Sequence, residues 1–326
     1  MARLMLRLET RCNSACAHCT VADIPASEAR SPESALAELV AARKRGCDEL
    51  VIMRGEPTLR PDLPGLARAA RRLGYRLVQI QTNGRMLCYE PYLERLIGAG
   101  VDFFEVSLFG ASSATADAIA GDPGAHAQTL AGLRLLAARP QLGHLVSVPV
   151  LAANLDELVA TVELIAELGL RRVQLNFTRP VRVEGRWRSE VLARLDDAGP
   201  AIRSALRRAR ALGLVASTEA VPLCQLDPED RGAAESARRF VDVAVVDLHR
   251  RHSSFAAHHR EVRPLAPACA TCSVAHTCPT TWAAYQQLFG TAELRPLSSP
   301  DEPSPAARAR GSDDLAASEA PVVAGG

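Results

Sequence analysis

Short apolar runs alternate along the first half of the chain with segments in which apolar residues recur at helical spacing. The runs are rich in β-branched residues, which is typical of buried strands. We expect strands at residues 4–8, 49–53, 76–81, 102–108, 145–150 and 171–177. We expect helices between Ser31 and Gly46 and at residues 63–73, 90–97, 125–138 and 156–168.

Six alternations of strand and helix predict an α/β fold in which parallel strands are joined by helical crossovers. An open doubly wound sheet and a β/α barrel both fit, and the periodicity alone does not choose between them. Further along, residues 181–187 predict a loop or a strand pair over the sheet, and residues 200–212 predict a helix ended by Gly213.

Composition limits the classes of partner. The 326 residues include 38 Lys and Arg against 37 Asp and Glu, a net charge of +1, and 48% are apolar. This size favours one large domain with a smaller one, and the near-zero charge gives no reason to expect nucleic acid or a membrane as partner. No apolar run approaches the ~20 residues that span a bilayer, and no secretory signal is visible. We therefore expect a cytoplasmic protein.

Three of the nine cysteines lie within eight residues, directly after the first expected strand. Cys12, Cys16 and Cys19 have the spacing C-x3-C-x2-C, and three thiolates this close can bind one soft metal centre. A cubane cluster has four irons, so three local ligands would leave one iron open. Half of a zinc site and a chance arrangement are the alternatives. Clustered thiols in a chain of this length favour metal binding over disulfides, and hence a reducing compartment.

This spacing resembles the cluster motif of the radical S-adenosylmethionine (radical SAM) enzymes. In that family the open iron binds the amino and carboxylate groups of SAM. The reduced cluster cleaves SAM to a 5'-deoxyadenosyl radical, which abstracts a hydrogen atom from substrate. His18 stands just before the third cysteine, where the family usually has an aromatic residue. The resemblance implies a partial (β/α)6 barrel of the TIM type, with a [4Fe–4S] cluster and SAM as cofactors.

A second motif follows the second expected strand. Its residues Arg54, Gly55, Glu56 and Pro57 resemble the Gly-Gly-Glu-Pro motif with which the same family binds the amino group of SAM. A carboxylate and nearby carbonyls supply the acceptors that an ammonium needs. Gly55 would let the backbone approach a ligand closely, and Pro57 would stiffen the turn. Arg54 replaces the family's first glycine, so it would be strained if that position needs a positive φ.

Polar residues end three of the other expected strands. Thr82 and Asn83 end the third strand, Ser107 lies near the end of the fourth, and Asn176 ends the sixth. In a β/α barrel the chemistry collects at the carboxyl ends of strands. The resemblance implies SAM contacts for the first three residues, and Asn176 is a further candidate at the same edge. A plain turn and polar groups satisfied within the sheet are the structural alternatives.

A third constellation lies near the C-terminus. Cys269, Cys272 and Cys278 have the spacing C-x2-C-x5-C, and Cys224 precedes them by 45 residues. Four thiolates close a metal site completely. The region resembles the SPASM or twitch extensions that hold auxiliary [4Fe–4S] clusters in many radical SAM enzymes, which implies a second, auxiliary cluster here. Structural zinc is the alternative, because C-x2-C pairs also occur in zinc sites.

These features predict a radical SAM core at residues 1–215, a small cysteine-rich SPASM/twitch-like domain at 216–295 and a disordered tail at 296–326. The resemblance implies an oxidoreductase or peptide-modifying maturase of natural product biosynthesis, served by an electron donor such as flavodoxin or ferredoxin. A peptide substrate is favoured, and a dehydrogenase or epimerase of a small-molecule natural product stays open. A non-catalytic zinc-binding protein is the alternative from another class.

Overall fold

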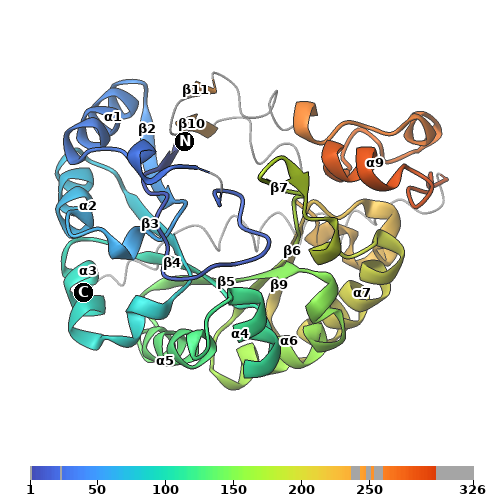
Figure 1. The fold of residues 1–326 in the computed structure, drawn as a ribbon, viewed down its shortest axis with the longest axis horizontal. Coiled ribbons are helices and arrows are strands. Elements are labelled where there is room, and N and C mark those ends of the chain that lie inside the picture. Colours follow the sequence, from blue (N-terminus) through green and yellow to red (C-terminus); the bar gives the residue numbers. More distant parts are fainter. Residues whose placement is uncertain (1, 23, 236–242, 247–250, 253–259, 299–326) are drawn as a thin grey trace.

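A curved sheet of nine strands organises the computed structural model, which describes residues 2–22, 24–235, 243–246, 251–252 and 260–298 (Figure 1). Its strands are β1 (Ala2–Arg7), β2 (Cys47–Met53), β3 (Leu77–Thr82), β4 (Phe103–Ser107), β5 (Gly143–Val150), β6 (Arg172–Phe177), β9 (Val215–Glu219), β10 (Val243–Val246) and β11 (Arg251–His252). The strand order is β11-β10-β1-β2-β3-β4-β5-β6-β9. All neighbours pair in parallel except β10 and β11, which are antiparallel. Strands β9 and β11 are the edges of this sheet, so the barrel is partial, as predicted.

Helices cover the outer face of the sheet (Figure 1). They are α1 (Pro32–Lys44), α2 (Leu63–Arg72), α3 (Glu90–Gly98), α4 (Ser113–Ala120), α5 (Ala125–Ala137), α6 (Leu158–Glu167) and α7 (Leu195–Ala211). Helix α1 begins where the sequence predicts, because the Ser31 side chain caps it by accepting from the Ser34 backbone N–H at 3.1 Å. The strand pair of β7 (Arg182–Val183) and β8 (Arg186–Trp187) follows β6, and the short helix α9 (Ala283–Phe289) lies in the cysteine-rich segment.

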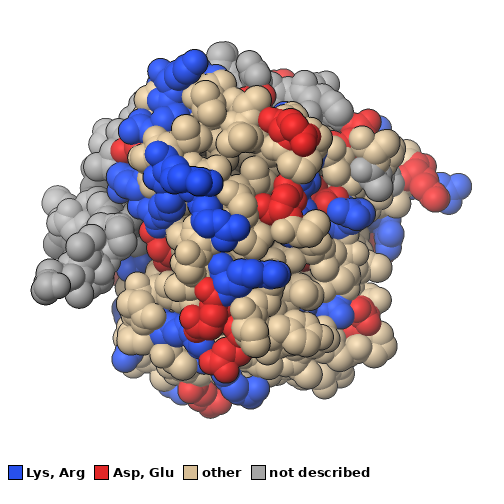
Figure 2. Space-filling view, turned by 90° about the vertical axis from the view of Figure 1, so that its left-hand side faces the viewer, with Lys and Arg blue, Asp and Glu red and all other residues tan. Residues whose placement is uncertain are grey.

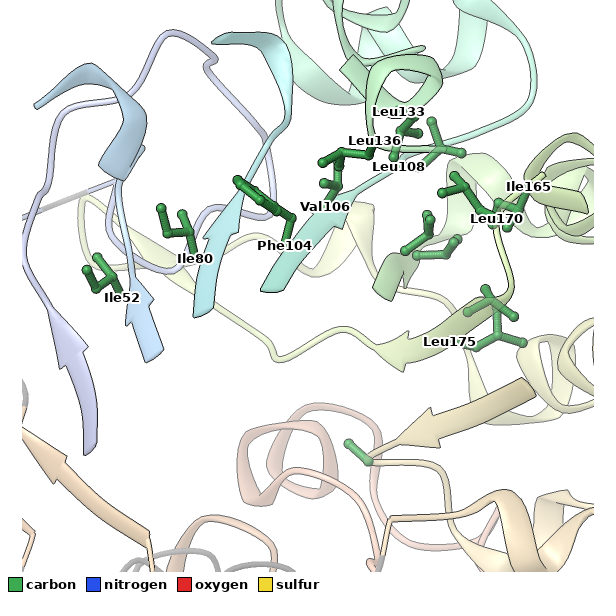
Figure 3. Close-up of a cluster of buried hydrophobic side chains, with 14 of the residues drawn as sticks. Ile52, Ile80, Phe104, Val106, Leu108, Leu133, Leu136, Ile165, Leu170 and Leu175 are labelled. Atoms are coloured by element: carbon green, nitrogen blue, oxygen red, sulfur yellow. The ribbon is translucent and has the colours of Figure 1, made fainter. Parts of the chain in front are cut away.

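Every second residue of the strands points outward into one core between sheet and helices. Ile52, Ile80, Phe104 and Val106 from three neighbouring strands are each at most 1% exposed, and Figure 3 shows them in a row with side chains of α5 and α6. This alternation follows from the two-residue period of a strand. The residues between them face the inside of the barrel, where Glu49, Gln79, Glu105 and other polar side chains lie.

The predicted elements recur with ends that differ by a few residues, and the remaining differences concern short or polar segments. Strands β9 and β10 were not expected, nor was α4. Helix α7 begins at Leu195 rather than at Pro200, so Pro200 lies inside the helix, where it removes one backbone hydrogen bond. The predicted boundary between residues 215 and 216 falls inside β9, which extends the core sheet. The predicted disordered tail lies outside the described residues from 299 onward.

The face that carries α1, α2 and α3 is rich in basic side chains (Figure 2). Arg43 and Lys44 lie in the last turn of α1, and Arg71 and Arg72 in the last turn of α2. Positive charge is favoured at these positions by the helix dipole, and acidic side chains are interspersed on the same face (Figure 2).

Among the described residues, no helix is both long and apolar enough to cross a bilayer.

Candidate metal and cofactor site

The three N-terminal cysteines lie together on the loop that follows β1 at the carboxyl-terminal edge of the sheet. Cys12 is exposed, whereas Cys16 and Cys19 are half-buried. Burial, and then the neighbouring thiolates of Cys12 and Cys19, raise the pKa of Cys16 to about 12. Burial also raises the pKa of Cys12, and the charges of Glu56 and Cys19 act in the same direction. The structure thus places the three thiols within range of one another's charge, and a bound cation would relieve that repulsion.

The end of α4 supports this loop from one side. The Ala15 backbone N–H donates to the Ala120 carbonyl at 2.8 Å. Gly121 ends the helix with a φ of +65°, and a Cβ at this position would lie 2.7 Å from the Ala15 carbonyl oxygen. Only glycine allows this approach at that φ.

The Gly55 backbone supports the loop from the other side. A Cβ on Gly55, whose φ is +55°, would lie 2.7 Å from the carbonyl carbon of Glu9 and 2.8 Å from the carbonyl oxygen of Arg11. The Glu56 backbone N–H donates to that same Arg11 oxygen at 2.8 Å. Gly55 therefore lets the end of β2 pack directly on the segment that leads into Cys12. The close approach predicted for Gly55 is made to the chain's own backbone.

Arg54 has a φ of +75°, in the left-handed region that favours glycine. The sequence predicts that Arg54 is strained if its φ is positive, and in the structure its φ is positive. Such strain costs about 1–2 kcal/mol per residue, and it recurs at functional sites.

The carboxylate of Glu56 is fully buried and bonds to the 3-10 helix Pro57–Leu59 and to the end of β3. Its Oε1 accepts from the Thr58 backbone N–H at 3.0 Å and from the Thr82 hydroxyl at 2.7 Å. Its Oε2 accepts from the Asn83 backbone N–H at 2.8 Å. Burial raises the pKa of Glu56, while these hydrogen bonds act to lower it. Two predicted cofactor contacts, Glu56 and Thr82, therefore bind each other. Pro57 opens the short 3-10 helix Pro57–Leu59 and is also buried.

Asn83 and Ser107 share a small pocket beside the cysteine loop. The Asn83 side-chain N–H₂ donates to the Asn13 side-chain oxygen at 2.7 Å and lies 3.7 Å from the Cys12 sulfur. The pocket is lined by Ser14, Asn83, Arg85, Ser107, Leu108, Phe109, Ala116, Ala120, Ala125, His126 and Thr129. His18, whose ring meets that of Phe109 edge to face at 5.2 Å, borders the same region. Asn83 is therefore the predicted residue that contacts both loop and pocket.

Asn176 lies elsewhere, on the inner face of β6. Its side-chain N–H₂ donates to the Ser147 hydroxyl at 2.5 Å, and its buried side-chain oxygen has no hydrogen-bond partner. It does not line the pocket of Asn83 and Ser107. The barrel interior near the centre of the sheet also carries Glu105, which accepts from both Gln79 and Gln81 at 2.9 Å. The two-residue alternation with the outward-facing Phe104 and Val106 accounts for the inward orientation of this carboxylate.

The four C-terminal cysteines line one pocket. Burial, followed by repulsion from the Cys224 and Cys269 thiolates, raises the pKa of Cys278 to about 11, against two backbone hydrogen bonds that lower it. Those bonds come from the backbone N–H groups of Leu223 and Thr280, each 3.4 Å from the Cys278 sulfur. The Leu297 N–H lies 3.4 Å from the Cys272 sulfur.

These contacts suit a thiolate site. N–H donors stabilise thiolates and adjust the potential of iron–sulfur centres. Two strained non-glycine residues flank the site, Ala220 with a φ of +57° and Thr280 with a φ of +55°. Within the described ranges, no group of three or more His, Cys, Asp and Glu side chains is placed so that it could hold a metal ion.

Tyr285 of α9 is a structural residue. It is 1% exposed, and its hydroxyl donates to the Glu293 carboxylate at 2.5 Å and accepts from the Leu195 backbone N–H at 2.8 Å. Its ring meets that of Phe177 at 5.3 Å. Tyr285 therefore anchors the cysteine-rich segment to the start of α7 and the end of β6.

Residues 8–165 match the Radical SAM superfamily. The chain is 34% identical over 178 residues to the AdoMet-dependent heme synthase of Methanosarcina barkeri, covering 53% of this chain and 49% of that protein. It is 32% identical over 190 residues to the PqqA peptide cyclase of Streptomyces rochei, covering 55% and 48%. The chain thus spans about half the length of the curated relatives it matches.

Solved structures resemble the fold. The crystal structure of Streptococcus suis SuiB bound to precursor peptide SuiA aligns with a TM-score of 0.57 at 17% identity, over 67% of this chain and 48% of that chain. The structure of anSMEcpe with bound AdoMet and a Cp18Cys peptide aligns with a TM-score of 0.54 at 14% identity, over 70% and 64%. Sequence identities this low show only that the folds are similar. Residues 8–165 therefore form a Radical SAM domain.

Proposed function

We propose that this protein is a radical SAM enzyme that reductively cleaves SAM and abstracts a hydrogen atom from a peptide substrate. The observation that carries the proposal is that Cys12, Cys16 and Cys19 lie on one loop, within range of one another's charge, at the carboxyl-terminal edge of a partial barrel and within a match to the superfamily. This edge is where β/α barrels hold their active sites.

The residues present fit the cofactors. Cys12, Cys16 and Cys19 would ligate three irons of a [4Fe–4S] cluster and leave the fourth to SAM. When bound, the cluster supplies the electron that cleaves SAM. Because the Glu56 carboxylate is enclosed by Thr58, Thr82 and Asn83, its part is to hold the ends of β2 and β3 in register. The backbone carbonyls near Arg54 and Gly55 are then the acceptors for the SAM ammonium.

The other predicted contacts divide by position. Asn83 and Ser107 line the pocket beside the loop and would face SAM. Asn176 lies on the inner face of β6 with an unpartnered oxygen, so it would face substrate or the far end of SAM. The polar inner face of the barrel suits a substrate with amide or carboxyl groups, which need hydrogen-bond partners when water is excluded.

A second, auxiliary [4Fe–4S] cluster bound by Cys224, Cys269, Cys272 and Cys278 is part of the proposal. Four thiols lining one pocket, three N–H···S contacts and the strained residues beside them support it. Both clusters require a reducing compartment, which favours the cytoplasm, and a small electron donor such as flavodoxin or ferredoxin. The cysteine-rich segment, with the boundary at 215/216 moved past β9, is the proposed SPASM/twitch-like unit.

The peptide substrate rests on likeness to the PqqA peptide cyclase and to the fold of SuiB, whose structure contains a precursor peptide. A second candidate substrate class is a small molecule, and the match to a heme synthase favours it. The two are separated by measuring whether a short peptide encoded beside this gene, or instead a tetrapyrrole, stimulates the release of 5'-deoxyadenosine.

The central experiment is anaerobic purification followed by assays of iron, sulfide and zinc, and incubation with dithionite and SAM. Two four-iron clusters predict about eight irons per chain, and 5'-deoxyadenosine release that the Cys16→Ala variant lacks. The Cys278→Ala variant should lose about four irons and keep SAM binding. Zinc without sulfide, together with intact SAM, would instead identify a zinc-binding protein.

A further inference from the structure

The Arg85 side chain contacts the N-terminal cysteine loop at two points. It follows the turn at the end of β3 as the first residue of the 3-10 helix Arg85–Cys88. Its guanidinium donates to the Asn13 carbonyl and, at 3.1 Å, to the Ser14 hydroxyl. Both acceptors lie between Cys12 and Cys16, so the arginine holds the segment that sets the distance between the first two thiols.

The same guanidinium is fixed from behind. Its Nε donates to the Gln128 side chain of α5 at 2.7 Å, and an Nη pairs with Asp122 at 2.7 Å. The Arg85 side chain is 11% exposed. With partners on the loop, on α5 and on the turn after α4, the guanidinium has little freedom to leave.

The position of this charge matters as much as the hydrogen bonds. Arg85 lies close enough to Cys16 for the two side chains to interact electrostatically. A half-buried cation acts on nearby charge much more strongly than one in water, because the surroundings screen it less. Reduction makes an iron–sulfur centre more negative, and neighbouring charge is one of the factors that set its potential.

We propose that Arg85 is a positioning residue of the N-terminal cluster site that also raises the reduction potential of the cluster, and that Asp122 moderates this effect through its ion pair with Arg85. The inference rests on the proposed function, since it requires a cluster on Cys12, Cys16 and Cys19. The contacts of Arg85 and Asp122 described above include no cysteine sulfur. Their influence on the cluster therefore passes through the loop backbone and through space.

Two single variants and their combination test this inference in the full-length chain. Arg85→Gln removes the positive charge and leaves Asp122 uncompensated. Asp122→Asn removes the negative charge and leaves the contacts of Arg85 with Asn13 and Ser14 in place. The double variant removes both charges. Each protein is prepared anaerobically, its iron and sulfide are measured, and its clusters are titrated with redox dyes and followed by EPR, taking the signal that added SAM perturbs.

At a fixed ambient potential, Arg85→Gln should lower the ratio of reduced to oxidised cluster about tenfold, a shift of about 59 mV for one electron. Asp122→Asn should raise the ratio, and the double variant should lie between the two single variants. If Arg85→Gln and Asp122→Asn both leave the potential unchanged, Arg85 is a tether without electrostatic influence and the inference is overturned.

Two controls keep the outcomes separate. Arg85→Lys retains the charge, so it should keep a potential near that of the wild type even if its iron content falls. If Arg85→Gln binds no iron, the reduction potential of the cluster in Asp122→Asn still tests the inference, because it should be higher than that of the wild type. A wild-type protein without iron and sulfide would instead contradict the proposed function itself.

Discussion

At the residue scale, Glu56 illustrates how packing can reassign a side chain that a motif marks as a ligand contact. The motif and the strand-end position predict Glu56 and Thr82 separately as cofactor contacts. In the structure the Thr82 hydroxyl donates to the Glu56 carboxylate at 2.7 Å and accepts from the Gly84 N–H at 3.0 Å. No local sequence pattern indicates this pairing, because it joins residues 26 positions apart.

We predict that Thr82→Val destabilises the protein by about 1–3 kcal/mol, because it leaves a buried carboxylate with one donor fewer. Thr178→Val is the matched control, since the buried Thr178 hydroxyl has no hydrogen-bond partner. That variant should be neutral or slightly stabilising. Urea unfolding of both measures the difference, and equal losses of stability would contradict the role assigned to Thr82.

Arg54 allows backbone strain to be separated from side-chain contacts. Arg54→Ala removes the side chain and keeps a Cβ at a φ of +75°, whereas Arg54→Gly removes both. The glycine variant should be more stable than the alanine variant by about 1 kcal/mol. Thermal unfolding compares the two variants, and an alanine variant as stable as the glycine variant would show that the backbone is unstrained.

At the element scale, the end of β2 and the cysteine loop fit together without side chains between them. This close packing depends on the Gly55 backbone, which lies against the backbone of Glu9 and Arg11. The motif predicts a close approach at Gly55, but its partner is found only in the structure, since β1 and β2 become neighbours through a helical crossover. Element ends were predicted best where apolar runs and caps coincide, as at Ser31. Strand β9 was not predicted at all, because three of the five residues in its sequence Val-Ala-Ser-Thr-Glu are polar.

The Gly55→Ala variant should lose about 2 kcal/mol or more and should bind less iron, because its Cβ would overlap backbone atoms of the cysteine loop. Gly46→Ala provides the control. Its φ of +93° is also unfavourable for alanine, but no atom lies within 4 Å of the new Cβ. It should lose about 1 kcal/mol and no iron. Iron loss in both variants would indicate that lower stability alone reduces iron binding, whatever the position of the substitution.

At the scale of the whole molecule, the alternation of strands and helices predicted the parallel α/β sheet correctly, because buried strands and amphipathic helices leave clear patterns. The partial barrel was implied only by the family resemblance. Two strands of the sheet, β9 and β10, were missed. Strand β10 pairs with β1 on the far side of the sheet from β9. Its apolar, β-branched sequence Val-Ala-Val-Val could have indicated a strand, whereas its partner could not have been predicted from local pattern.

Two histidines, the buried His126 and the half-buried His144, should make the stability of the whole fold depend on pH. Burial lowers the pKa of His126 and of His144 below the usual value. Unfolding releases each to its ordinary pKa of about 6.5, so the unfolded chain binds more protons and stability falls as the pH drops below that value. His144→Gln keeps an acceptor for the Arg171 N–H, which donates to His144 at 3.0 Å. That variant should lose less stability between pH 7 and 5.5, and parallel pH profiles would contradict the prediction.

The proposed chemistry depends on an iron that the protein leaves open to SAM. EPR spectroscopy of the anaerobically reduced, full-length protein tests this directly, with and without added SAM. We predict that SAM changes the signal of one of two clusters, and that the Cys16→Ala protein shows only the signal that SAM does not affect. Identical wild-type spectra in the presence and absence of SAM would contradict the account.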